Sequence, residues 1–209
     1  MIRESISVKV CGMREAENIR ETEALGIDLM GFIFWPKSSR YVNERPAYLP
    51  TNCKRVGVFV DASLEDIQQH AHDYQLDIIQ LHGQESPAFA KALKPLSVIK
   101  AFNIATAEDL QKTEEYEGMV DCFLFDTKGK VVGGNGEKFD WSVLEAYHGD
   151  TPFLLSGGIG PDDVEAVRAF HHPRCIGIDL NSRFELAPAL KDVTRIQEFL
   201  KELNHEVYE

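Results

Sequence analysis

Short runs of β-branched, aliphatic and aromatic residues alternate with longer amphipathic segments along this chain. Eight runs rich in Val, Ile, Leu and Phe predict strands, at residues 7–11, 29–34, 55–60, 77–81, 98–102, 122–126, 153–156 and 175–180. Apolar positions three and four residues apart predict helices between most of them, at residues 15–25, 64–74, 86–93, 107–116, 141–147 and 162–170. A last predicted helix covers residues 191–203.

Strands that alternate with helices predict a parallel sheet, because a parallel neighbour needs a crossover connection and a helix is the usual one. Eight such units favour an α/β fold with a single closed (β/α)₈ TIM barrel. Residues 43–49, after the second strand, are too short and too poor in apolar residues for a full helix. An open, doubly wound sheet of six or seven strands is therefore the alternative. No linker or shift in composition divides the chain, so we expect residues 1–209 to form one catalytic domain.

Composition narrows the class of protein. With 44% hydrophobic and 27% charged residues, the 209-residue chain can bury a sizeable core. No apolar run approaches the roughly 20 residues that span a bilayer, and residues 1–9 lack the features of a signal peptide, so we expect a cytoplasmic protein. We expect a monomer, although apolar residues on outer helices would serve packing and association equally.

The formal net charge of −12 repels nucleic acids and anionic membranes, so neither is an expected partner. A small anionic ligand would have to be held locally, by a few cations and by backbone amides. The four cysteines, at positions 11, 53, 122 and 175, form no CxxC pair and have no histidine at metal-ligand spacing, so neither a disulfide scaffold nor a zinc site is expected. Cys122 and Cys175 lie in apolar runs and are expected in the core.

Polar side chains gather where the predicted strands end, which is where a (β/α)₈ barrel carries its active site. They are Lys9 and Cys11 after strand one, Lys37 and Arg40 after strand two, Asp61 after strand three, His82 after strand four, Asp126 after strand six, Ser156, Gly157 and Gly158 after strand seven, and Asp179, Asn181 and Ser182 after strand eight. Turns alone would favour small residues, so this convergence predicts a functional site.

Two glycine clusters are candidates for anion binding. Gly157 and Gly158, shortly before Pro161 at a helix start, can turn bare amides toward a phosphate, although a tight turn would use the same residues. The second cluster, residues 133–136 with Gly134 at its centre, follows Asp126 and could cover the site or add amides.

A candidate acid and a candidate base stand at two strand ends. Cys11 shares a strand face with Lys9, whose ammonium is expected to lower the thiol pKa and favour a thiolate base. Asp126 follows an apolar run, where desolvation is expected to raise the carboxyl pKa and to keep a general acid protonated. The alternatives are an inert buried cysteine and an aspartate that hydrogen-bonds its own loop.

Two further side chains are candidates for substrate binding. His82 either lines the pocket or ties its strand to the next loop. Arg40 either grips a carboxylate with two hydrogen bonds or lies in solvent, where Lys37 is also expected.

Taken in order, these segments resemble the phosphoribosylanthranilate isomerase family of tryptophan biosynthesis. The similar segments are residues 8–12, 31–34 with Ser38, Arg40 and Val42, residues 56–60 and 80–83, Asp126 with Gly133 and Gly134, residues 139–141 and 155–159, residues 179–182 with Glu185, and Lys191 with Asp192. The resemblance runs the length of the chain, and its specificity comes from the order of the motifs.

The resemblance implies an Amadori rearrangement of N-(5-phosphoribosyl)anthranilate to the deoxyribulose phosphate, with no cofactor and no metal. Cys11 corresponds to the base that removes the sugar C2 proton, and Asp126 to the acid that protonates the ring oxygen. Arg40 corresponds to the residue facing the anthranilate carboxylate, and Asp179 to a carboxylate that contacts the ligand. The loops that hold the phosphate correspond to those with Gly134, Gly157, Gly158 and Ser182.

The chain departs from the family's pattern after strand eight. Arg183 stands where a glycine is common, and Pro188-Ala189 where the family has Pro-Gly. The Arg183 guanidinium is expected either to join the phosphate site or to point to solvent. Competing interpretations are a pentose-phosphate epimerase, an indole-glycerol-phosphate synthase, or a phosphosugar-binding module without chemistry. The first needs a metal site, the second a lysine-rich site, and the third would not need Cys11 and Asp126.

Overall fold

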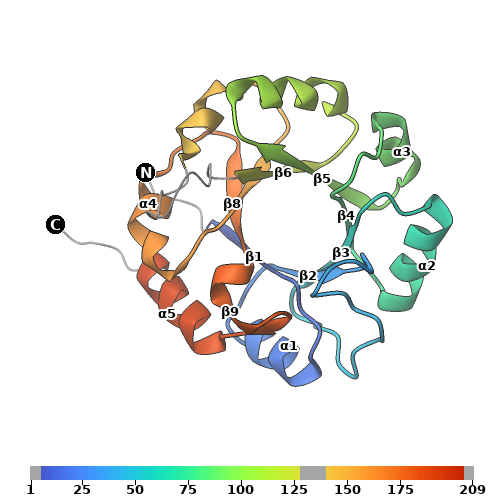
Figure 1. The fold of residues 1–209 in the computed structure, drawn as a ribbon, viewed down its shortest axis with the longest axis vertical. Helices are drawn as coiled ribbons and strands as arrows, with labels where there is room; N and C mark the ends of the chain where they lie inside the picture. Colours follow the sequence, from blue (N-terminus) through green and yellow to red (C-terminus); the bar gives the residue numbers. More distant parts are fainter. Residues whose placement is uncertain (1–5, 128–139, 205–209) are drawn as a thin grey trace.

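Eight parallel strands close into a barrel with helices outside it (Figure 1). In this computed structural model the described residues are 6–127 and 140–204. The strands pair in chain order, and the last pairs with the first. They are β1 (Ser7–Cys11), β2 (Leu29–Ile33), β3 (Lys54–Phe59), β4 (Ile78–Leu81), β5 (Ser97–Ile104), β6 (Cys122–Thr127), β7 (Phe153–Ser156) and β8 (Cys175–Leu180). The prediction of a closed barrel is confirmed, and the open-sheet alternative is wrong.

The outer ring combines α-helices and 3₁₀ helices. The α-helices are α1 (Ala16–Glu23), α2 (Leu64–Tyr74), α3 (Pro87–Ala92), α4 (Val164–Ala169) and α5 (Val193–Asn204). The 3₁₀ helices are η1 (Ala107–Tyr116), η2 (Trp141–Ala146), η3 (Pro161–Asp163) and η4 (Ser182–Phe184). Within the described residues, the segment between β2 and β3 forms no helix, as its composition predicted.

Helix α2 shows how local sequence produces an element. The Ser63 side chain caps it by accepting a hydrogen bond from the amide of Asp66. Its buried residues Ile67, Ala71 and Tyr74 follow the helical spacing of four and three. In η1 the buried residues are instead Leu110, Thr113 and Tyr116, three apart, which matches the three residues per turn of a 3₁₀ helix. The prediction located this helix correctly but did not distinguish its type.

A short antiparallel hairpin follows β8 and was not predicted. It consists of β9 (Glu185–Ala187) and β10 (Leu190–Lys191). The backbone amide of Lys191 donates to the Asn18 side chain, whose own amide donates back to the Lys191 carbonyl. These bonds to α1 keep Lys191 out of the final helix, so the predicted helix start at residue 191 is wrong by two residues.

Alternate residues of each strand face opposite sides of the barrel wall. Those facing the helices form the main core with the helices' apolar stripes. Those facing inward form a smaller cluster made of Val56, Ile99, Ala101, Cys122, Leu124 and Leu154. The inward positions two residues further along several strands are polar, so the barrel interior changes from apolar to polar toward its C-terminal end.

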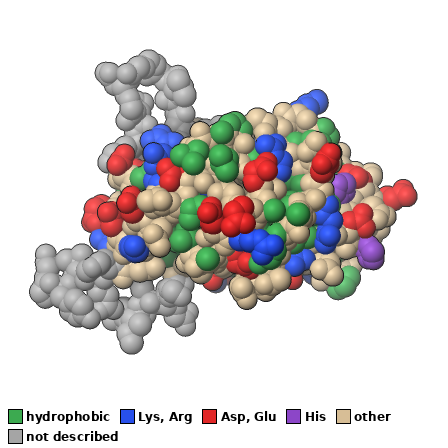
Figure 2. Space-filling view, turned by 90° about the horizontal axis from the view of Figure 1, so that it is seen from below, with side chains coloured by type: hydrophobic (Ala, Val, Ile, Leu, Met, Phe, Trp, Pro, Cys, Tyr) green, Lys and Arg blue, Asp and Glu red, His purple; other side chains and the backbone are tan. Residues whose placement is uncertain are grey.

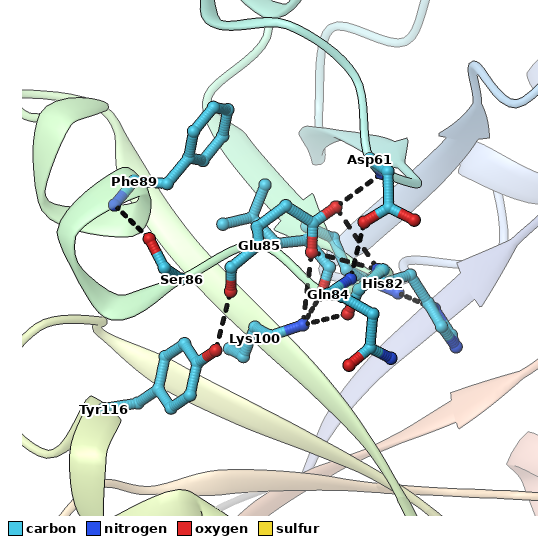
Figure 3. A network of polar contacts seen from close by, with 11 residues as sticks. Asp61, His82, Gln84, Glu85, Ser86, Phe89, Lys100 and Tyr116 are labelled. Carbon is cyan, nitrogen blue, oxygen red and sulfur yellow. Dashed lines mark hydrogen bonds and ion pairs between the residues drawn. The ribbon is translucent and has the colours of Figure 1, made fainter.

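A buried ion pair supports that end of the barrel (Figure 3). The Lys100 ammonium on β5 lies 3.2 Å from a Glu85 carboxylate oxygen and donates to the carbonyl of Gly83. The Glu85 carboxylate also accepts hydrogen bonds from the amides of Gly83 and Asp61. The Tyr116 hydroxyl of η1 donates to the Glu85 carbonyl. The loop after β4, which carries His82, is therefore held to β3, β5 and η1.

Outside the barrel, charged side chains of both signs are scattered among hydrophobic ones on the side drawn in Figure 2. None of the helices in residues 6–127 and 140–204 has the length and apolar character needed to cross a membrane.

We predict that Lys100→Met lowers the free energy of unfolding by about 3–5 kcal/mol, because the buried Glu85 carboxylate loses its cation. Urea unfolding followed by circular dichroism measures this. The matched control is Lys112→Met, which breaks an exposed pair with Asp109 and should change stability much less. Equal losses in the two variants would contradict a supporting role of the buried pair.

Candidate active site

A pocket of about 210 Å³ opens at the C-terminal ends of the strands. Its lining comes from seven strands or strand ends: Cys11, Ile33, Val58, Gln80, His82, Asp126, Ser156, Gly157, Gly158, Ile159, Asp179, Asn181 and Ser182. Seven of the predicted site residues are therefore together in one place, as the convergence of strand ends required.

A larger hollow, of about 940 Å³, lies at the opposite end of the barrel, around the starts of β1, β2 and β3. Its most buried carboxylate, Glu23, already accepts hydrogen bonds from the Tyr48 hydroxyl and from the amides of Thr51 and Asn52. These bonds tie α1 to the segment before β3, and the N-terminal face of such a barrel generally serves stability. We therefore place the candidate site in the smaller pocket.

Cys11 ends β1 and is 4% exposed. Its neighbour across the β1–β2 ladder is Gly31, where an added Cβ would lie 2.7 Å from the Cys11 sulfur. The absence of a side chain at position 31 therefore leaves room for the Cys11 thiol. Burial raises the pKa of the Cys11 thiol, and Asp179 adds to this rise, while Lys9 and Lys191 oppose it. The prediction of a lowered thiol pKa is wrong because desolvation outweighs the ammonium groups.

Lys9 and Asp179 form a buried ion pair below Cys11, and Asp179 also lines the pocket. The Lys9 ammonium lies 2.8 Å from the Asp179 carboxylate, and the two residues are direct partners in the β1–β8 ladder. Burial disfavours the Lys9 charge, but Asp179 and Cys11 raise the pKa of the ammonium above its usual value. The second Asp179 oxygen accepts a hydrogen bond of 3.2 Å from the Ser156 hydroxyl. Asp179 is thereby oriented from two sides.

Asp126 lies on β6, near its end, and is half-buried. It pairs with Asn103 of β5 and Ser156 of β7 in the sheet register. The two residues before it, Leu124 and Phe125, are buried, so the carboxyl stands where the apolar strand meets the pocket. Asp126 and Cys11 line the same pocket from different strands.

His82 lines the pocket, which answers the question that the sequence left open. Burial lowers the pKa of the imidazole below 6.5, with Asp126 opposing this shift. The ring is therefore neutral near pH 7. The side-chain NH₂ of Gln80 lies 3.1 Å from His82 Nδ1, and because this group can only donate, Nδ1 accepts. The ring proton is then on Nε2, which does not contact Gln80 and can donate a hydrogen bond.

The loop after β7 has the geometry of an anion site. Gly157 and Gly158 have φ values of +101° and +68°, which favour glycine. Among the described residues, the amides of Gly157, Gly158 and Ile159 have no hydrogen-bond acceptor. Ser182, at the start of η4, lines the same pocket. The predicted phosphate residue Gly134 lies outside the described residues.

Arg40 lies next to the pocket but is not part of its lining. Its guanidinium donates to both oxygens of Glu185, at 2.6–3.1 Å, and Glu185 also accepts from the Lys191 ammonium at 2.6 Å. This cluster packs on Gly12, where an added Cβ would lie 2.7 Å from Arg40 Cδ and 3.5 Å from Lys191 Nζ. Burial opposes ionisation of Glu185, but hydrogen bonds from Arg40 and Lys191 hold the pKa of its carboxyl below the usual range.

Two other strand-end residues lie away from the pocket. Lys37 is exposed, as predicted. Asp61 is also exposed and accepts a hydrogen bond of 2.6 Å from the amide of Gln84, within the network around Glu85 (Figure 3). Asp61 therefore stabilises the loop after β4 and does not contribute to the pocket.

Gln80, Glu185 and Lys191 belong to the segments that resemble the family, but sequence reasoning assigned them no role in the surroundings of the site. Gln80 could have been found, because it lies two residues before His82 on a strand and so faces the same side. The contact between Lys191 and the site depends on the β9–β10 hairpin, which has no strong local signal.

Comparisons with known proteins agree over nearly the whole chain. The family described as N-(5'-phosphoribosyl)anthranilate (PRA) isomerase matches residues 8–202. The chain is 51% identical over 210 residues to the N-(5'-phosphoribosyl)anthranilate isomerase of Parabacteroides distasonis, covering 97% of this chain and 95% of that one. It is 52% identical over 202 residues to the enzyme of the same name from Phocaeicola vulgatus, covering 96% and 98%.

Solved structures are similar over the same length. Phosphoribosyl anthranilate isomerase from Thermotoga maritima superimposes with a TM-score of 0.80 at 31% identity, covering 95% of this chain and 98% of that one. A structure of phosphoribosyl anthranilate isomerase in complex with reduced 1-(o-carboxyphenylamino)-1-deoxyribulose 5-phosphate has a TM-score of 0.79 at 30% identity, with the same coverage.

The Gln80–His82 contact generates a prediction for the free protein. Imidazole ¹⁵N shifts should show His82 with its proton on Nε2 and a pKa below 6.5, and Gln80→Leu should remove this tautomer preference. Gln69→Leu, a change on the exposed face of α2, is the control and should leave the His82 signals unchanged. A proton found on Nδ1 in the parent would mean that the Gln80 side-chain oxygen, and not its NH₂ group, faces His82, and would contradict this prediction.

Proposed function

This chain belongs to the N-(5'-phosphoribosyl)anthranilate isomerase family, and we propose that Cys11 and Asp126 are the base and the acid of its reaction. The protein is an isomerase of tryptophan biosynthesis that converts N-(5'-phosphoribosyl)anthranilate into 1-(2-carboxyphenylamino)-1-deoxyribulose 5-phosphate. The observation that supports the assignment of roles is the pocket itself, in which a thiol, a carboxyl and three unpaired amides come together.

In the first step, Asp126 donates its proton to the ring oxygen of the ribose. The bond between C1 and this oxygen breaks, and the lone pair of the anthranilate nitrogen forms a C=N bond to C1. The product of this step is an open-chain iminium ion with a new hydroxyl at C4. An acid at this position is needed because an alkoxide is a poor leaving group at neutral pH.

In the second step, the Cys11 thiolate removes the proton from C2. The electron pair of the C–H bond forms a C1=C2 double bond, and the iminium nitrogen becomes neutral. The resulting enol then gains a proton at C1 and loses the proton of its C2 hydroxyl, which gives the ketone. Acid and base stand on different strands, β6 and β1, as two proton transfers on a bound sugar require.

Substrate binding falls to the remaining polar groups. We assign the anthranilate carboxylate to Arg40, whose guanidinium is already oriented by Glu185. Neutral His82 and Asp179 are assigned to the sugar, as donor and acceptor respectively. The phosphate is assigned to Gly157, Gly158, Ser182 and Gly134, of which the first three line the pocket. The bound ligand of one structural relative, reduced 1-(o-carboxyphenylamino)-1-deoxyribulose 5-phosphate, carries the carboxylate and the phosphate that these assignments require.

We predict that Cys11→Ala and Asp126→Asn each lower turnover by about 10²–10⁴-fold, the usual contribution of a general acid or base. The assay follows the loss of N-(5'-phosphoribosyl)anthranilate fluorescence. Both variants should still bind the reduced product analogue in calorimetry, because neither loses a phosphate or carboxylate contact.

The matched controls are Cys175→Ala and Asp73→Asn, both outside the pocket lining, which should retain parental turnover. Undiminished turnover of Cys11→Ala would remove the base from this mechanism. Loss of analogue binding along with turnover would instead point to a damaged pocket.

The raised thiol pKa gives a prediction for pH dependence. A base must be deprotonated, so raising its pKa shifts the rise of activity toward alkaline pH. We expect kcat/KM of the parent to increase from about pH 7 to about pH 9, and the residual activity of Cys11→Ala to lack this increase. A plateau over this range in the parent would contradict a base whose pKa is raised by burial.

A further inference from the structure

The pocket lining contains two carboxylates but no lysine or arginine among the described residues. The substrate brings a phosphate with a charge of about −1.5 to −2 near neutral pH, and the whole chain has a formal charge of −12. The nearby ammonium groups of Lys9 and Lys191 are each paired with a carboxylate, Asp179 and Glu185. The amides of the β7 loop supply partial charges, so a full positive charge at the phosphate must come from outside this lining.

Arg183 lies beside this loop. It directly follows Ser182 in η4, and its side chain crosses the backbone of Gly160. An added Cβ on Gly160 would lie 3.3 Å from Arg183 Nε and 3.5 Å from Nη2. Glycine at position 160 therefore leaves room for the guanidinium, one residue beyond the unpaired amide of Ile159.

Within the described part of the chain, the Arg183 guanidinium has no hydrogen bond and no ion pair. The Asp163 carboxylate, three residues after Gly160, accepts a hydrogen bond of 2.8 Å from the Gly160 amide. It forms no ion pair with Arg183. Arg40, Arg168 and Arg174 are each bound to a carboxylate. The hydrogen-bond donors of the Arg183 guanidinium are thus available next to the loop after β7.

We propose that Arg183 binds the substrate phosphate together with the amides of Gly157, Gly158 and Ile159. This inference rests on the proposed phosphate site and adds a residue that determines affinity for the phosphorylated ligand. The phosphate is remote from the carbons that react, so Arg183 contributes equally to ground-state and transition-state binding. Its loss therefore raises KM and leaves kcat nearly unchanged. Because the side chain is exposed, salt weakens its contribution.

The experiment compares Arg183→Gln with Arg174→Gln, which makes the same change of charge at an exposed pair with Asp150, among residues that line a different hollow. Calorimetric titration with inorganic phosphate and steady-state kinetics with N-(5'-phosphoribosyl)anthranilate are run for both variants and the parent. We expect Arg183→Gln to weaken phosphate binding and raise KM by about tenfold at low salt. We expect kcat to stay within about twofold, and the difference to shrink with added salt.

Arg183→Lys keeps the charge and should recover part of the affinity, since the ammonium lacks the planar set of donors. Unchanged phosphate affinity in Arg183→Gln, or equal losses in Arg183→Gln and Arg174→Gln, would overturn the proposal. The two proposals can be refuted independently. Arg183-dependent phosphate binding together with undiminished turnover of Cys11→Ala and Asp126→Asn would refute the proposed base and acid, whereas turnover without this dependence on Arg183 would refute the role of Arg183.

Discussion

The buried ion pair between Lys9 and Asp179 is the interaction on which the site depends. It joins the first and last strands at the seam where the barrel closes, and it lies below the thiol of Cys11. Neither charge would be stable alone in this interior, because desolvation costs each of them several kcal/mol. Closure of the barrel brings the two together, and the same pair then sets the electrostatic surroundings of the pocket. Fold and site are therefore coupled through one contact.

The surroundings of Cys11 show how burial and charge compete. Lys9 and Lys191 favour a thiolate, whereas burial and Asp179 favour the thiol, and the balance raises the thiol pKa. A protonated resting thiol has low reactivity toward oxidants and electrophiles, which depend on the thiolate. The same thiol becomes a strong base once its proton is removed. Gly31 leaves space for the sulfur at this point, and the Arg40–Glu185–Lys191 cluster packs against Gly12 next to it.

The acidic composition explains why backbone amides, rather than buried cations, are proposed to hold the phosphate in this pocket. Two carboxylates in the lining and a net charge of −12 oppose a phosphorylated, carboxylated ligand. Amides of a loop with positive φ carry no net charge, so they attract an anion but need no buried counterion in the free protein. An arginine at the edge, still in contact with solvent, adds charge at little desolvation cost. Arg183 meets both conditions, because it lies against Gly160 at the edge of the loop and its side chain is exposed to solvent.

Local patterns in the sequence determined the eight strands, most of the helices and the polar residues at the strand ends. Inward-facing positions repeat every second residue, and parallel strands place their C-terminal ends on one side, so Cys11, His82, Asp126 and Asp179 were predictable as neighbours. The tertiary structure alone decided the sign of the Cys11 pKa shift, because desolvation depends on everything packed around the sulfur. It also decided the partner of Arg40 and the position of Lys191, since both depend on a hairpin whose contacts come from residues more than a hundred positions away. The periodicity of the sequence predicts which side of a strand or helix a residue faces, but its contacts on that side are determined only by tertiary packing.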